Sequence, residues 1–183
     1  MNKRTPIYLT VSAMFLSLGL VLPFLTGQIP QIGRMLLPMH LTVLLCGMVC
    51  GWQYGLVVGA ITPILRSVLF GMPQLYPDAV VMFFELATYG FVIGIVYHGL
   101  KKQNIFTAYL SLIIAMISGR AVYGVVKYLL LTAKASGYAW SLFVADAFLN
   151  SIPGIVIQLV LIPALMLVLD RTGLLPYRND TRA

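Results

Sequence analysis

The chain has 183 residues, of which 60% are hydrophobic and only 9% are charged, and its mean hydropathy is +0.94. A soluble domain of this length could not cover so much apolar surface, so we expect an integral membrane protein that lies almost entirely in the bilayer. The formal net charge is +7, but the basic residues are scattered and form no stripe with interleaved aromatic residues, which argues against a nucleic-acid partner.

Six apolar segments divide the chain. A spanning helix needs about 20 apolar residues, and that length places helices at about 7–26, 36–51, 53–71, 79–98, 106–130 and 142–169. We therefore predict an all-α integral membrane protein with six transmembrane helices in a compact bundle. This single domain covers residues 1–183, and its last part, 170–183, is a short cytoplasmic tail.

The first segment, 7–26, follows Lys3-Arg4 as a signal peptide would, but no small-residue cleavage site follows it. We expect a retained helix. It carries the small residues Ala13 and Ser17 four positions apart, a spacing that lets another helix approach closely.

The second and third segments, 36–51 and 53–71, are short for full spans. They meet at Gly51–Gly55, whose glycines and polar glutamine predict a tight turn at a membrane surface. Beyond them, two prolines and a glycine in residues 71–78 break helical continuity.

Small residues around this turn indicate close packing. Glycines recur at every fourth position: Gly47, Gly51, Gly55 and Gly59. Because the turn falls among them, we expect two separate close contacts between helices. Cys46 and Cys50 lie in the same apolar stretch with no histidine or carboxylate beside them, so we expect them to pack in the core and to bind no metal.

Six spans place both termini on one side of the membrane, and the distribution of Lys and Arg indicates which side. With the N-terminus inside, seven basic residues are cytoplasmic: Lys3, Arg4, Lys101, Lys102, Arg171, Arg178 and Arg182. Only Arg34 and Lys134 are then outside. We predict that both termini are cytoplasmic and that the basic residues are attracted to anionic lipids of the bilayer.

Polar side chains inside the apolar segments indicate where the function lies, because a charge in hydrocarbon is expensive and normally faces a protein-lined cavity. These residues are Arg66, Glu85, Arg120, Lys127 and Asp146, with Asn150 one turn after Asp146. In the predicted orientation all of them fall in the outer half of the membrane. Four helices contribute them, as a pocket that opens outward would require.

Spacing groups these residues further. Arg120 and Lys127 are about two helical turns apart on one face, with Tyr123 beside Arg120. Tyr89 shares the face of Glu85. Glu85 lies about two turns inside its helix, which favours a role in a pocket or a polar network.

Other interpretations stay open for the remaining residues. Arg66 and Lys127 lie near helix ends, from which long side chains reach the interface. Asp146 suits an internal ion pair with Arg120 or Lys127 as well as a substrate contact. His40, near the outer start of the second helix, suits an interfacial or capping role as well as a ligand contact.

Motifs that are missing narrow the function. The chain has no phosphate-binding loop motif, so it does not hydrolyse ATP itself. It has no metalloprotease or serine-hydrolase motif and no clear repeat that relates two halves. These features favour a small binding subunit that takes its energy from partner proteins.

The chain resembles the substrate-binding S components of energy-coupling-factor (ECF) transporters, which import vitamins in prokaryotes. The resemblance covers about Thr5 to Leu169 and rests on size, six helices and the pair Ala13/Ser17. It also rests on two apolar helices around a Gly-x-x-Tyr-Gly turn, in the stretches Leu37–Leu41, Gly51–Gly55 and Arg66-Ser67. Ser17 replaces a more usual alanine, but serine is also small and can bond back to its own helix.

This resemblance implies a subunit of the prokaryotic plasma membrane that captures its ligand in a pocket near the outer face. A lid loop at residues 28–35 would contribute Gln31 and Arg34. Ala13 and Ser17 would dock on a membrane coupling (T) protein, which is joined to two cytoplasmic ABC-type ATPases. The chain would then have no catalytic residue, metal or cofactor of its own, because its partners use the ATP.

The implied substrate is a vitamin or vitamin precursor of the pantothenate, pyridoxine, thiamine-precursor or cobalamin-precursor type. The candidate substrate-binding residues are His40, Arg66, Glu85, Tyr89, Arg120, Tyr123, Lys127, Asp146 and Asn150. One alternative is an intramembrane enzyme that modifies a lipid or isoprenoid, with Glu85 and Asp146 as acid or base. A second alternative is an autonomous small-solute transporter or channel.

Overall fold

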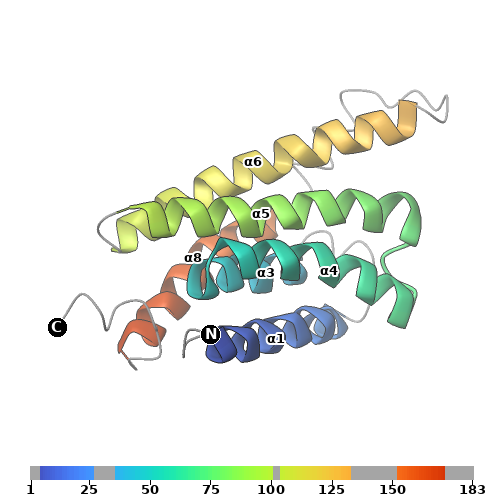
Figure 1. Cartoon of the computed structure of the whole chain (residues 1–183). Coiled ribbons are helices and arrows are strands. Elements are labelled where there is room, and N and C mark those ends of the chain that lie inside the picture. Colours follow the sequence, from blue (N-terminus) through green and yellow to red (C-terminus); the bar gives the residue numbers. More distant parts are fainter. Residues whose placement is uncertain (1–4, 27–35, 101–103, 133–151, 172–183) are drawn as a thin grey trace.

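The computed structural model describes residues 5–26, 36–100, 104–132 and 152–171, and every regular element in these ranges is helical (Figure 1). The helices are α1 (Thr5–Val21), α3 (Pro38–Cys50), α4 (Trp52–Phe70), α5 (Val80–Gly99), α6 (Ile105–Thr132) and α8 (Ile152–Arg171). Two short helical turns, η1 (Leu22–Thr26) and η2 (Leu75–Ala79), follow α1 and precede α5.

The six predicted helices are confirmed in this part of the chain. Five helical stretches are long and apolar enough to cross a membrane, whereas α3 has only 13 residues. The first part of the predicted sixth helix, 142–151, and the predicted tail at 172–183 lie outside the described residues.

The turn between α3 and α4 is shorter than the sequence predicts. Only Gly51 is non-helical, with φ 96° and ψ 171°, a backbone conformation that favours glycine. Its N–H donates to the carbonyl of Gly47 at 3.1 Å, and its carbonyl accepts from the N–H of Gly55 at 3.0 Å. The expected five-residue turn is therefore wrong, because residues 52–55 already form the first turn of α4.

Helix α5 lies inside the bundle, in contact with α3, α4 and α6, while α1 packs on α3 and α4 (Figure 1). Figure 1 places α1 and α6 at opposite edges of the bundle, and α1 begins on the side where α8 ends. Which side is cytoplasmic remains a prediction.

Glycines let three helices approach closely. A Cβ atom on Gly55 would lie 2.6 Å from the carbonyl oxygen of Gly90, and one on Gly47 would lie 2.7 Å from the same atom. The glycines of α3 and α4 thus converge on one glycine of α5, where two separate contacts were expected. One turn along α4, Gly59 packs against the backbone of Leu86. These contacts fix α5 against its neighbours.

Helix α1 packs through one face only. A Cβ atom on its buried Gly19 would lie 2.9 Å from Oγ1 of Thr42 in α3 and 3.0 Å from Cγ2 of Thr62 in α4. Both threonine hydroxyls donate to carbonyls of their own helices, so no polar group is left unpaired at this contact. The face that carries Ala13 and Ser17 is exposed.

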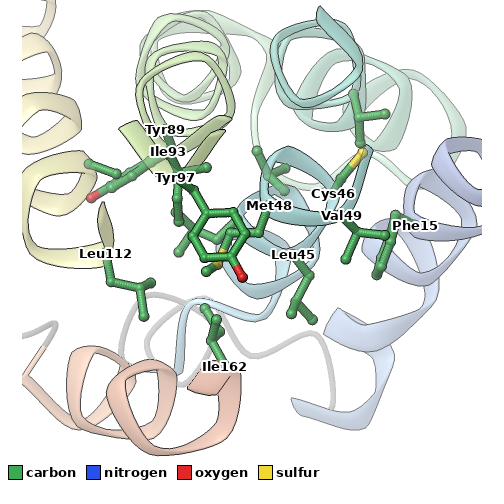
Figure 2. Packing of buried hydrophobic residues seen from close by; sticks show 14 of the residues in the cluster. Phe15, Leu45, Cys46, Met48, Val49, Tyr89, Ile93, Tyr97, Leu112 and Ile162 are labelled. Atoms are coloured by element: carbon green, nitrogen blue, oxygen red, sulfur yellow. The ribbon is translucent and has the colours of Figure 1, made fainter. Parts of the chain in front are cut away.

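The core gathers side chains from all six of the described helices, with Val58 as the contribution of α4. Figure 2 shows Phe15 of α1 and Leu45 of α3 in the same cluster as Ile93, Leu112 and Ile162 of α5, α6 and α8. The free thiols Cys46 and Cys50 are buried in it as well, which confirms their predicted packing role.

The variant Gly90→Ala tests the glycine contact. Its new methyl group would overlap the backbone of Gly55, so we expect a loss of about 1–3 kcal/mol in stability, the usual cost of overpacking. The measurement is the thermal unfolding midpoint of the protein in detergent. Gly99→Ala on the same helix is the control, because no atom lies within 4 Å of its new Cβ. Equal midpoints for the two variants would contradict the packing described.

Candidate functional site

The carboxylate of Glu85 is the centre of the polar residues. Glu85 lies near the start of α5 and is only 1% exposed. Its Oε1 lies 3.2 Å from Nη1 of Arg120 in α6 and 3.4 Å from Nε2 of His40 in α3. A buried charge is tolerated when an opposite charge accompanies it. Glu85 therefore lies in a polar network, one of its two predicted roles, and its role in a pocket stays a prediction.

Tyr89, one turn after Glu85, holds two of these residues in place. Its ring meets the His40 ring edge to face, with centroids 5.3 Å apart and planes at 72°. On its other side it packs against Gly119, where a Cβ atom would lie 2.8 Å from Cε2 of Tyr89. Since Gly119 directly precedes Arg120, this close approach brings the guanidinium within reach of Glu85.

The polar residues continue along one face of α6, as predicted. Cζ of Arg120 lies 5.9 Å from the ring centroid of Tyr123, and Nζ of Lys127 lies 4.9 Å from the same centroid. The Lys127 ammonium also donates a hydrogen bond of 2.6 Å to the Tyr123 hydroxyl. Tyr123 therefore contacts both cations.

Arg66 lies in a different place. It is 2% exposed, it donates a hydrogen bond to the carbonyl of Leu20, and its Cζ lies 5.0 Å from the ring of Phe24 and 5.5 Å from that of Phe70. Arg66 thus joins the end of α4 to the end of α1 and to η1, inside the protein. Its contacts in the described residues are with this junction, and a role in substrate binding stays a prediction.

Gln158 of α8 belongs to the site but was missed by sequence reasoning. It is 2% exposed, and its Nε2 donates to the carbonyl of Leu37 at 3.3 Å. The same carbonyl accepts from the N–H of His40 at 3.1 Å. Gln158 therefore supports the first turn of α3, which carries His40. The signal in the sequence was a single amide in an otherwise apolar helix.

The other candidate residues lie outside the described residues. They are Asp146 and Asn150 as substrate contacts and Gln31 and Arg34 in the lid loop. Their roles stay predictions.

Comparison with known families decides the identity. The family model described as "ECF transporter, substrate-specific component" matches residues 8–166. The chain belongs to this family. No similar protein was found among curated sequences, and no similar chain was found among solved structures.

Several predictions are settled by membership. This S component is a multi-pass protein of the prokaryotic plasma membrane, it binds a substrate without a cofactor, and the ATPases of the ECF transporter use the ATP. Its partners are the substrate and the other ECF subunits. S components are transport proteins, so the intramembrane-enzyme alternative is wrong.

The cluster suits the binding of a polar compound within apolar helices. Among the described residues near Glu85, one carboxylate accompanies two cations, Arg120 and Lys127. Both nitrogens of His40, and Nε and Nη2 of Arg120, are buried and have no hydrogen-bond partner in the described part of the S component. Since unpaired buried groups are costly, these atoms favour a ligand that supplies partners.

A double-mutant cycle tests the pair. Glu85→Gln or Arg120→Gln each leaves an uncompensated buried charge, so we expect each to lower stability by about 3–5 kcal/mol. The double variant should lose much less than the sum, as measured by thermal unfolding of the S component in detergent. Glu85→Gln combined with Arg66→Gln is the control and should be additive. Additive losses in the Glu85–Arg120 cycle would contradict the ion pair.

Proposed function

We propose that this S component captures a vitamin or vitamin precursor at the cluster around Glu85. The cluster consists of His40, Glu85, Tyr89, Arg120, Tyr123 and Lys127. The observation that carries the proposal is a fully buried carboxylate whose partners come from two other helices. Ionisable groups are kept at membrane depth chiefly where they serve a function.

The location of the cluster fits capture from outside the cell. His40 and Glu85 lie near the starts of α3 and α5. With a cytoplasmic N-terminus, α1 runs outward and both of these helices run inward, so their starts face the outside. The excess of Lys and Arg in the segments expected in the cytoplasm supports this orientation.

The chemistry of the cluster fits a small, water-soluble compound. Donors and an acceptor lie together with the rings of Tyr89 and Tyr123, which present aromatic surface beside the polar atoms. Compounds of the pantothenate, pyridoxine, thiamine-precursor and cobalamin-precursor types combine polar groups with a compact skeleton.

Native mass spectrometry tests the capture role. The full chain is purified from cells grown in rich medium, and the small molecules released from it are identified. We expect one vitamin-like compound per chain, because an importer of scarce nutrients must hold its substrate tightly. A protein that releases only phospholipid, or nothing, would contradict the proposal.

The exposed face of α1 is the proposed docking surface for the coupling (T) protein, which carries two cytoplasmic ATPases. Ser17 donates its hydroxyl to the carbonyl of Ala13 at 3.0 Å, and Thr10 donates to Pro6 at 2.9 Å. The hydroxyls are thus satisfied within α1, so Thr10, Ala13 and Ser17 present small side chains with no unpaired polar group. Small residues let a partner helix approach closely.

Bulky substitutions test this docking surface. Ala13→Leu and Ser17→Leu should leave ligand binding by the purified chain unchanged, because both positions are on the exposed face of α1. Uptake of the ligand by cells that also contain the partner subunits should be lost. Val160→Leu on α8, at a position 65% exposed, is the control and should keep uptake. Normal uptake by the α1 variants would remove this face as the docking surface.

A further inference from the structure

We infer that the captured compound carries an anionic group, a carboxylate or a phosphate, and that this group binds the edge of Arg120 formed by Nε and Nη2. The inference rests on the proposed function, because it concerns the compound held at the same cluster. It goes further by naming the chemical class of the ligand and the atoms that select it.

The contacts of Arg120 leave one edge of its guanidinium for a ligand. Nη1 is directed to Glu85, at 3.2 Å, and the ring of Tyr123 lies 5.9 Å from Cζ. Nε and Nη2 are buried and have no hydrogen-bond partner in the described ranges, although the residue is only 5% exposed. Their N–H bonds are parallel in an arginine side chain.

Two parallel N–H donors match the two oxygens of a carboxylate or phosphate, and such paired hydrogen bonds are the strongest that arginine makes. Leaving them unmade in a buried site carries the full cost of removing these charged donors from water. A ligand whose carboxylate or phosphate offers two oxygens to these donors therefore stabilises the site more than a ligand with a single neutral acceptor would.

The unpartnered nitrogens of His40 define the rest of the ligand. Nε2 of His40 lies 3.4 Å from Oε1 of Glu85, the same oxygen that Arg120 contacts, and neither His40 nitrogen has a hydrogen-bond partner in the described residues. A hydroxyl, amide or ring nitrogen on the ligand could pair with it. The arrangement favours a small acid with neighbouring hydrogen-bonding groups, such as pantothenate, over an uncharged compound such as pyridoxine.

The test compares probes that differ mainly in the charge. Pantothenate is paired with its alcohol panthenol, and nicotinate with nicotinamide, and binding to the full chain is measured by ligand-induced thermal stabilisation. The compound that copurifies is identified in parallel by native mass spectrometry. We expect the copurified compound to be an acid. Where a probe pair binds, we expect the acid to bind more tightly, with an affinity at least about 10-fold higher than that of its neutral partner.

Two arginine variants locate the selecting group. Arg120→Lys keeps the charge but lacks the paired donors, so the affinity for the acid should fall roughly 10-fold to 100-fold. Arg66→Lys is the matched control: it also replaces a buried arginine, but one held by Leu20, Phe24 and Phe70, and the preference for the acid should persist.

Three outcomes would overturn the inference while leaving capture intact. One is a neutral or cationic copurified compound, and another is equal affinity for the acid and its neutral partner. The third is an acid whose affinity is unchanged in Arg120→Lys, which would indicate that another residue selects it. A chain that releases only phospholipid and binds no probe would contradict the proposed function itself, and the inference with it.

Discussion

The burial of the Glu85 carboxylate is the constraint on which the rest of the structure depends. A carboxylate buried inside an apolar helix requires an opposite charge from a neighbouring helix. Arg120 supplies this charge from α6, and Nε2 of His40 in α3 lies 3.4 Å from the same carboxylate oxygen, so α5 is in contact with both helices. Glycines make that position attainable, because Gly47 and Gly55 bring α3 and α4 against Gly90 of α5, and Gly119 admits the ring of Tyr89.

The two proposed activities use different parts of the bundle. The ligand cluster joins α3, α5 and α6, whereas the docking face lies on α1, at the edge of the bundle opposite α6 (Figure 1). Helix α3 connects them, since it carries His40 in the cluster and Thr42 in the contact with Gly19 of α1. Arg66 adds a second anchor for α1 through the Leu20 carbonyl. A capture subunit needs this arrangement, because its partner must bind without obstructing the ligand.

Most of the helix boundaries, and the two residues of the central ion pair, were within reach of sequence reasoning, but their pairing was not: the only partner suggested for Arg120 was Asp146. Segment length determined the helices, because a bilayer has a set thickness, and the cost of a charge in hydrocarbon singled out Glu85 and Arg120. Helical periodicity correctly placed Tyr89 with Glu85, and Tyr123 with Arg120. The family resemblance was confirmed by the family model that matches residues 8–166.

What sequence reasoning could not supply was which helix faces which. Periodicity orders residues on one helix, but the partner of Arg66 is a backbone carbonyl 46 residues away, and no pattern identifies it. Gln158 carries no charge, so a search for charges missed it although it supports the turn that holds His40. The convergence of the glycines on Gly90 depends on the one-residue turn at Gly51, and its length follows from a backbone angle that composition does not specify.

An experimental structure of the full chain with its copurified compound bound would test the central claim most directly. We predict that the compound lies within hydrogen-bonding distance of Arg120 and His40, beside Glu85, while Arg66 remains bonded to Leu20. A compound bound elsewhere, with no contact to Arg120, His40 or Glu85, would show that the buried cluster serves only to hold the helices together and would contradict the assignment of the substrate site.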